Sequence, residues 1–396
     1  MMRVSPLKQA HDVIVIGAGV VGLACAWRLA RRGLSVLVLE RARPGAGASG
    51  VAAGMLAPVT EADFGEQDLL ALNLVAAAGW PAFAAELEQA SGLPIGYRKS
   101  GALVVAADRD DAEELARLHA FQTSLGLEVE WLSGSGARRL EPSLSPRVAG
   151  AIHAVADHSV DPSAVVEALG AALVAEGGEI HCGADVASPA VHEGRVTGVR
   201  MRSGEIAEAG AVVVAAGCWS GALGGVPEEE RPPVRPVKGQ ILSLRRPPHA
   251  SGLGAAAPTL AERIVRTPRC YVVDRGDGRV VVGATVEERG FDTSVTAGGV
   301  FELLEAAREV LPDVVELEWV GARAGLRPGT PDNAPVIGPG ALAGLVWATG
   351  HHRNGVLLAP VTAEAVARLL VEGELPERVR PFDPARFARS PAGSAR

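Results

Sequence analysis

Three spaced glycines and a downstream acid have the residue types of a phosphate-binding turn. The apolar run 13–16 leads directly into Gly17, Gly19 and Gly22. The first glycine permits a sharp turn, the second lets the backbone approach a pyrophosphate, and the third permits close helix–sheet packing. The helix that follows presents free N–H groups to the phosphates. Glu40 ends the next strand-like run, where a carboxylate accepts the ribose hydroxyls of an adenosine. This context favours dinucleotide binding over a glycine-rich turn without a ligand.

Two later segments have the composition of further contacts to the same ligand. Residues 47–55 form a run of small residues, and residues 350–357 connect a strand to a helix through a loop. The buried strand 212–217 also ends in small residues, at Gly217. A nicotinamide cofactor needs only the first turn, whereas extended FAD reaches from the adenine to a flavin ring that the other segments would meet. A helix starting after Asn354 would direct its N-terminus at the flavin N1–C2=O group. We therefore expect FAD.

The elements that must position these residues belong to two kinds of sheet. Apolar runs alternate with helical patterns in most of the chain, whereas residues 232–326 have the pattern of antiparallel strands, two of them joined by a turn at 276–278. We expect an α/β fold, α+β overall, with a Rossmann-like FAD-binding domain interleaved with an antiparallel-sheet substrate domain. The expected parts are FAD-binding domain 1–92, 155–230 and 330–378, substrate domain 93–154 and 231–329, and flexible tail 379–396.

Composition limits the partners. A chain of 396 residues is long enough for two domains, and its net charge of −8 without a basic stripe argues against a nucleic-acid partner. No run of eighteen apolar residues occurs, so no membrane span or membrane partner is expected. Four scattered cysteines predict neither a disulfide framework nor a zinc site, and favour the cytoplasm. His351 and His352 are adjacent on a loop and lack an acidic cluster, so no metal site is expected. We expect the acidic residues Glu61, Asp63 and Glu66 to form a solvated surface turn.

Four segments resemble the D-amino-acid oxidase superfamily of flavoproteins, and within it the glycine oxidases. They are residues 53–56, 325–330, 350–360, and the pair 270–273 with 282–285. The resemblance covers roughly residues 12 to 370 and implies oxidation of glycine, sarcosine or D-alanine. The products would be an imine, then a 2-oxo acid and ammonia, with oxygen reduced to hydrogen peroxide. In many bacteria glycine oxidases serve the synthesis of the thiamine thiazole. Similar proteins are homo-oligomers, so we expect one here.

The resemblance and the glycine pattern together assign the site residues. Arg327 and Arg353 would bind the substrate, with Tyr271 assisting, and no protein group is expected to act as acid or base. A guanidinium fork matches a carboxylate bidentately, although a surface salt bridge is the alternative for Arg327. The expected FAD contacts are Gly17, Gly19, Val20, Val21, Gly22, Glu40, Arg41, Ala48, Ser49, Ala53, Gly54, Met55, Val186, Gly217, Gly350, His351, His352, Arg353, Asn354, Gly355, Val356 and Leu357.

Three positions depart from the family pattern. Ala48 stands where the family often has Thr, which removes one hydroxyl contact to the cofactor. Val286 stands where some glycine oxidases have Met, so we expect it to alter the size of amine that the pocket accepts. The cysteine that carries covalent flavin in related sarcosine oxidases is absent near Arg327, so FAD would be non-covalent.

Two other functions stay open at this stage. One is a D-amino-acid or sarcosine-type dehydrogenase that passes electrons to a quinone, and the other is a non-catalytic FAD- or NAD-binding regulator.

Overall fold

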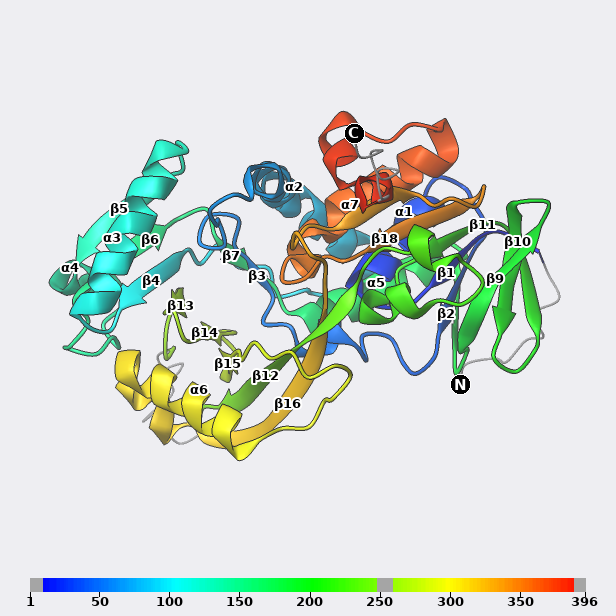
Figure 1. The fold of residues 1–396 in the computed structure, drawn as a ribbon. Helices are drawn as coiled ribbons and strands as arrows, with labels where there is room; N and C mark the ends of the chain where they lie inside the picture. The colour runs from blue at the N-terminus through cyan, green and yellow to red at the C-terminus, as the bar shows by residue number, and fades with distance from the viewer. Residues whose placement is uncertain (1–9, 248–258, 388–396) are drawn as a thin grey trace.

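Two large sheets organise the chain in the computed structural model, which describes residues 10–247 and 259–387 (Figure 1). The first sheet has the strand order β17-β18-β11-β1-β2-β8, and the hairpin β9–β10 extends from β11. Strands β8, β2, β1, β11 and β18 are parallel, and β17 is antiparallel. Its strands are β1 (His11–Ile16), β2 (Val36–Glu40), β8 (Glu179–Cys182), β9 (Val186–His192), β10 (Arg195–Met201), β11 (Ile206–Val214), β17 (Val336–Pro339) and β18 (Leu345–Thr349).

Four helices cover one face of the first sheet. They are α1 (Val20–Ala30), α2 (Gln67–Ser91), α5 (Pro162–Ala175) and α7 (Gly355–Glu372). Their apolar side chains and those of β1 and β2 form the largest described core cluster, in which Trp27 and Trp80 are fully buried. Asp161 caps α5 through Ser163 N–H at 3.0 Å, and Pro162 occupies the first turn.

The second sheet is mostly antiparallel and has the order β16-β12-β15-β14-β13-β4-β6-β5, with only β4 and β13 running parallel to each other. Helices α3 (Arg109–Ser124), α4 (Gly134–Leu140) and α6 (Ala297–Val310) pack against it. Its strands are β4 (Ala102–Ala106), β5 (Val129–Ser133), β6 (Gly150–Ala154), β12 (Arg235–Arg245), β13 (Ile264–Arg266), β14 (Tyr271–Asp274), β15 (Arg279–Gly283) and β16 (Glu318–Gly329). The expected interleaving of two sheet types is confirmed, and the domain boundaries given above stay a prediction.

Short elements complete the fold. A two-stranded ladder joins β3 (Met55–Leu56) to β7 (His158–Ser159) between the large sheets. The 3-10 turns are η1 (Ala48–Val51), η2 (Gly217–Ala222), η3 (Glu228–Glu230), η5 (Pro312–Glu316), η6 (Glu377–Phe382) and η7 (Pro384–Phe387).

The structure describes only the first part of the expected flexible tail. Most of residues 379–387 belong to η6 and η7, and Phe382 packs into the core of the first sheet, only 2% exposed. The remainder, 388–396, lies outside the described residues. Because Phe382 belongs to the core of the first sheet, the chain stays packed against that core after α7 ends at Glu372.

Helix α2 is the one helix in the described ranges whose length and hydropathy would allow it to cross a bilayer. Leu72, Trp80 and Leu87 on this helix are at most 1% exposed and belong to the core of the first sheet. The apolar character of α2 is therefore accounted for by its packing against α5 and α7.

Candidate functional site

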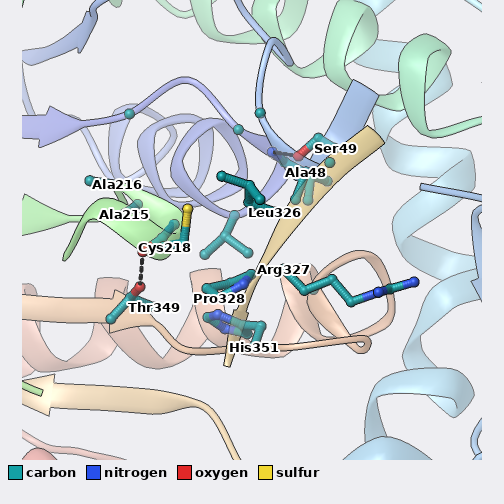
Figure 2. Close-up of a pocket in the computed structure, with 18 of the residues that line it drawn as sticks. Ala48, Ser49, Ala215, Ala216, Cys218, Leu326, Arg327, Pro328, Thr349 and His351 are labelled. Atoms are coloured by element: carbon teal, nitrogen blue, oxygen red, sulfur yellow. Dashed lines mark hydrogen bonds between the residues drawn. The ribbon is translucent and has the colours of Figure 1, made fainter. Parts of the chain in front are cut away.

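A cavity of about 390 Å³ lies between the two sheets. Its wall comes from the glycine turn after β1, the loop that contains η1, the start of η2, strand β16, and the loop from β18 to α7. Figure 2 shows Ala48 and Ser49 across the cavity from His351, with the Arg327 side chain extending away from Cys218 and Thr349. Segments far apart in the sequence thus form one continuous site.

Most of the residues expected at the cofactor line this cavity. Three do not, namely Gly22, Gly350 and Leu357, which lie behind its wall. The lining members of the expected set are Gly17, Gly19, Val20, Val21, Glu40, Arg41, Ala48, Ser49, Ala53, Gly54, Met55, Val186, Gly217, His351, His352, Arg353, Asn354, Gly355 and Val356. Their contact with FAD stays a prediction.

Close backbone packing requires two of the glycines in the first turn. Gly17 has φ +104°, and a Cβ there would lie 2.5 Å from the carbonyl oxygen of Ala215. A Cβ on Gly22 would lie 2.0 Å from the carbonyl oxygen of Gly17. Gly19, between them, lines the cavity. The turn therefore brings a bare backbone and the start of α1 to the cavity, as a pyrophosphate requires.

Glu40 and Ser49 hold this turn in place. One carboxylate oxygen of Glu40 accepts from Ala18 N–H and the other from Ala42 N–H, both at 2.9 Å. The Ser49 hydroxyl accepts from Val20 N–H at 3.0 Å, so a side chain from η1 satisfies the first turn of α1. Both side chains also line the cavity, and the acceptance of ribose hydroxyls by Glu40 stays a prediction.

A second helix N-terminus faces the cavity at α7. Asn354 precedes its first residue and makes no side-chain cap hydrogen bond, and Asn354, Gly355 and Val356 line the wall. Such an end offers backbone N–H groups and a positive dipole to an anionic group. Two separated helix N-termini that face one cavity fit two groups of FAD, the pyrophosphate and the flavin N1–C2=O group.

The two histidines before α7 are neutral. Burial lowers the pKa of His351 to about 3, and its Nε2 lies 2.9 Å from Thr362 Oγ1. Burial, with the charges of Arg353 and Arg327, lowers the pKa of His352 to about 4. Neither imidazole therefore carries the second proton of the cationic form near neutral pH.

The guanidinium of Arg327 lines the cavity and is packed closely against backbone atoms. Its Nη1 donates to the carbonyl oxygens of Lys238 at 3.3 Å and Thr285 at 3.1 Å. A Cβ on Gly239, in the neighbouring strand β12, would lie 2.3 Å from the same Nη1. Burial lowers the pKa of Arg327, but a guanidinium remains charged at any pH at which the protein is folded. The surface salt bridge considered for this residue is excluded, because the side chain lines the cavity.

Tyr271 lies beside Arg327. A Cβ on Gly283 would be 2.4 Å from the Tyr271 hydroxyl, so a glycine makes room for the phenol as Gly239 does for the guanidinium. Burial raises the pKa of Tyr271, which keeps the hydroxyl protonated as a donor. Arg327 and Tyr271 together offer a carboxylate both charge and directed hydrogen bonds.

Glu61 is a site residue that the sequence did not reveal, and the expectation that it is solvated is wrong. Its side chain is 8% exposed and lines the cavity. Arg266 Nη1 donates to Oε1 at 2.5 Å, and Arg353 Nε lies 3.3 Å from Oε2. Burial alone would raise the pKa of Glu61, but the charges of Arg266, Arg353 and Arg327 lower it overall. Glu61 is therefore an ionised carboxylate between two guanidinium groups.

Val286 does not shape the cavity. It is 69% exposed and lies outside the lining, so the expectation that it limits the size of the substrate amine is wrong. The neighbouring Thr285 reaches the site through its carbonyl oxygen instead, which accepts from Arg327.

Residues 12–369 match the family model described as FAD dependent oxidoreductase, abbreviated DAO. The chain belongs to this family. The match covers both sheets and every segment that lines the cavity, so FAD is the cofactor that the site is built to hold.

Three relatives show which members of the family the chain is similar to. A glycine oxidase of Geobacillus kaustophilus is 33% identical over 95% of this chain and 97% of its own length. The hydrogen cyanide synthase subunit HcnC of Pseudomonas aeruginosa is 29% identical over 98% of this chain and 99% of its own. The bifunctional protein ThiO/ThiG of Trichormus variabilis is 33% identical over 96% of this chain but 56% of its own length.

The crystal structure of the Geobacillus kaustophilus glycine oxidase superposes with a TM-score of 0.85 and covers 96% of this chain and 99% of that one. This glycine oxidase is similar to the present chain in fold as well as in sequence, and the chain is an FAD-dependent amine oxidoreductase. The sequence-based assignment to the D-amino-acid oxidase superfamily, near the glycine oxidases, is confirmed.

Proposed function

We propose that the protein oxidises glycine or another small amino acid, such as sarcosine or D-alanine, to the imine, with oxygen as the electron acceptor. Water would then release a 2-oxo acid and the amine, which is ammonia from glycine or D-alanine and methylamine from sarcosine. The buried guanidinium of Arg327 carries the proposal, because it enters the same cavity as the two helix N-termini. FAD, when bound, would accept a hydride from the substrate Cα and pass the electrons to oxygen to form hydrogen peroxide.

The substrate carboxylate is the group that Arg327 and Tyr271 would orient. Nη1 of Arg327 is fixed by two backbone carbonyls, so the fork has a set direction before the substrate arrives. Removing one partner of such a buried charge pair costs about 2–5 kcal/mol, or roughly thirty- to several-thousand-fold in binding. Much of the catalysis would come from holding Cα in position relative to the cofactor.

The substrate amine must arrive unprotonated, because the titratable groups at the site are poor proton acceptors. The pKa of His351 is lowered to about 3 by burial and that of His352 to about 4. The pKa of Tyr271 is raised and that of Glu61 is lowered, so neither changes its charge near neutral pH. The substrate ammonium group would then lose its proton to solvent before the chemical step, and the protein need not supply an acid or a base.

A role in making the thiamine thiazole, in the cytoplasm and as a homo-oligomer, completes the proposal. Likeness to a bifunctional ThiO/ThiG protein supports the pathway. The four cysteines are free thiols, which suits a reducing compartment.

Oxygen uptake and peroxide formation by the FAD-loaded protein test the proposal. Glycine, sarcosine and D-alanine should each be tried, and the second measurement is the release of ammonia, or of methylamine from sarcosine. Equal amounts of oxygen consumed and peroxide formed are expected. Turnover that needs an added quinone would establish a dehydrogenase instead, and no turnover with any of the three would reject the substrate class.

A further inference from the structure

Three guanidinium groups and one carboxylate lie at the end of the cavity where the substrate would bind. Arg327, Arg353 and Glu61 line it, and Arg266 reaches Glu61 from β13. Two of the three guanidinium groups share the Glu61 carboxylate, whereas Nη1 of Arg327 donates to backbone carbonyls. Arg327 is therefore the guanidinium whose charge is left for a ligand.

Glu61 is held in this position by a buried polar network. Asp157 is fully buried and accepts from Val59 N–H at 3.0 Å, Thr60 N–H at 3.1 Å and the Thr60 hydroxyl at 2.5 Å. Arg266 donates to both Thr60 Oγ1, at 3.2 Å, and Glu61. The backbone that precedes Glu61 is thus fixed by Asp157, and the carboxylate cannot turn into solvent without breaking its pairs with Arg266 and Arg353.

A fixed carboxylate near the substrate anchor acts on any second charge of the ligand. Arg327 and Glu61 line the same cavity, and the charge of Arg327 contributes to lowering the pKa of Glu61. A ligand held by Arg327 therefore lies within electrostatic reach of Glu61. A second anionic group on that ligand would be repelled by Glu61 and would find Arg266 and Arg353 already paired.

We propose that Glu61 is a specificity-determining residue that restricts the site to amino acids with a single carboxylate. It does so by occupying Arg353 and Arg266 and by repelling a second anionic group. The inference rests on the proposed use of Arg327 as the carboxylate anchor. It predicts that amines with two carboxylates, such as iminodiacetate, are poor substrates because of charge and not because of size.

Two unreactive ligands of the same shape test this inference. Diglycolate carries two carboxylates, and diglycolamate carries one carboxylate and one neutral amide in place of the second. Neither has an amine to oxidise, so both dissociation constants can be measured from the change in flavin absorbance of the FAD-loaded protein. Wild type should bind diglycolamate at least about tenfold more tightly than diglycolate, which is about 1.4 kcal/mol.

The variant E61Q removes the charge and keeps the side-chain shape. The preference for the monoanion should fall by about tenfold or more, since the repulsion disappears and Arg353 becomes available. E66Q is the matched control: it makes the same exchange on the same loop, but Glu66 bonds Asn333 and lies outside the cavity wall. E66Q should keep the wild-type preference. FAD content and melting temperature are recorded for each protein.

The outcomes separate this inference from the proposed function. A wild-type protein that binds diglycolate as tightly as diglycolamate overturns the inference even if E61Q does not fold. An unchanged preference in FAD-loaded E61Q overturns it as well. Failure of wild type to bind either ligand rejects Arg327 as a carboxylate anchor, and the inference with it. A shifted preference in E61Q without oxidation of any amino acid rejects the proposed reaction alone.

Discussion

Replacing Gly239 with alanine should disable the carboxylate anchor while Arg327 itself is kept. The new Cβ would lie 2.3 Å from Nη1, 2.5 Å from Nη2 and 2.6 Å from Cζ of Arg327. Since carbon and nitrogen atoms in contact are normally about 3.5–4.0 Å apart, the guanidinium must move by about 1 Å or more. Misplacement of about 1 Å lowers rates by about a hundredfold, or about 2.7 kcal/mol.

Steady-state kinetics with the best of the three substrates checks this prediction. The value of kcat/KM for G239A should fall by about a hundredfold, while FAD content stays at the wild-type level. G298A is the control, because a Cβ there meets nothing within 4 Å and the residue lies in α6. A wild-type kcat/KM in G239A would refute the claim that the fitted position of Arg327 matters.

Three further results are expected. With substrate amine as the only titrating group, kcat/KM should rise with pH through the substrate ammonium pKa; a profile set by a protein group near pH 6.5 would contradict this. W219L should weaken FAD binding about fivefold, because Arg41 Cζ lies 3.8 Å over the Trp219 ring and both residues line the cavity. Titration of the apoprotein with FAD measures this change. The control W131L, at a residue outside the cavity lining, should bind FAD as wild type does. The pKa of His351 is about 3 when folded and 6.5 when unfolded, so its contribution to stability is lost as pH falls below 6.5. H351Q should lessen the loss of unfolding free energy in urea between pH 7 and pH 5 by about 2 kcal/mol, and an equal loss in both proteins would count against a buried neutral imidazole.

Features encoded by neighbouring residues could be predicted from the sequence. The strand 13–16, the glycines that follow it and the acid at Glu40 are local, and the structure places them as one parallel β-α-β unit. The cap of α5 by Asp161 is likewise a short-range pattern. The antiparallel character of the second sheet followed from strand spacing and a turn between β14 and β15.

Features set by distant partners could not be predicted. Glu61 follows a flexible run of small residues and precedes Asp63, so its sequence context is that of a surface turn. It is buried because Arg266, 205 residues further along the chain, pairs with it. Nothing near Glu61 in the sequence signals that pairing.

Helical geometry explains another difference. Residues 350–357 were expected to face one ligand, but α7 begins at Gly355, and successive helical residues point in different directions. Leu357 consequently turns into the core, where its carbonyl oxygen accepts from Trp80 Nε1 at 2.8 Å. The helical period thus separates Leu357 from Val356, which lines the cavity.

Anaerobic titration of the purified FAD-loaded protein with glycine, sarcosine and D-alanine tests the central claim most directly. If Arg327 holds an amino acid carboxylate within reach of the cofactor, the absorbance of the oxidised flavin should disappear with at least one of the three and return when oxygen is admitted. A flavin spectrum that none of them bleaches, or protein that cannot be loaded with FAD, would contradict the account.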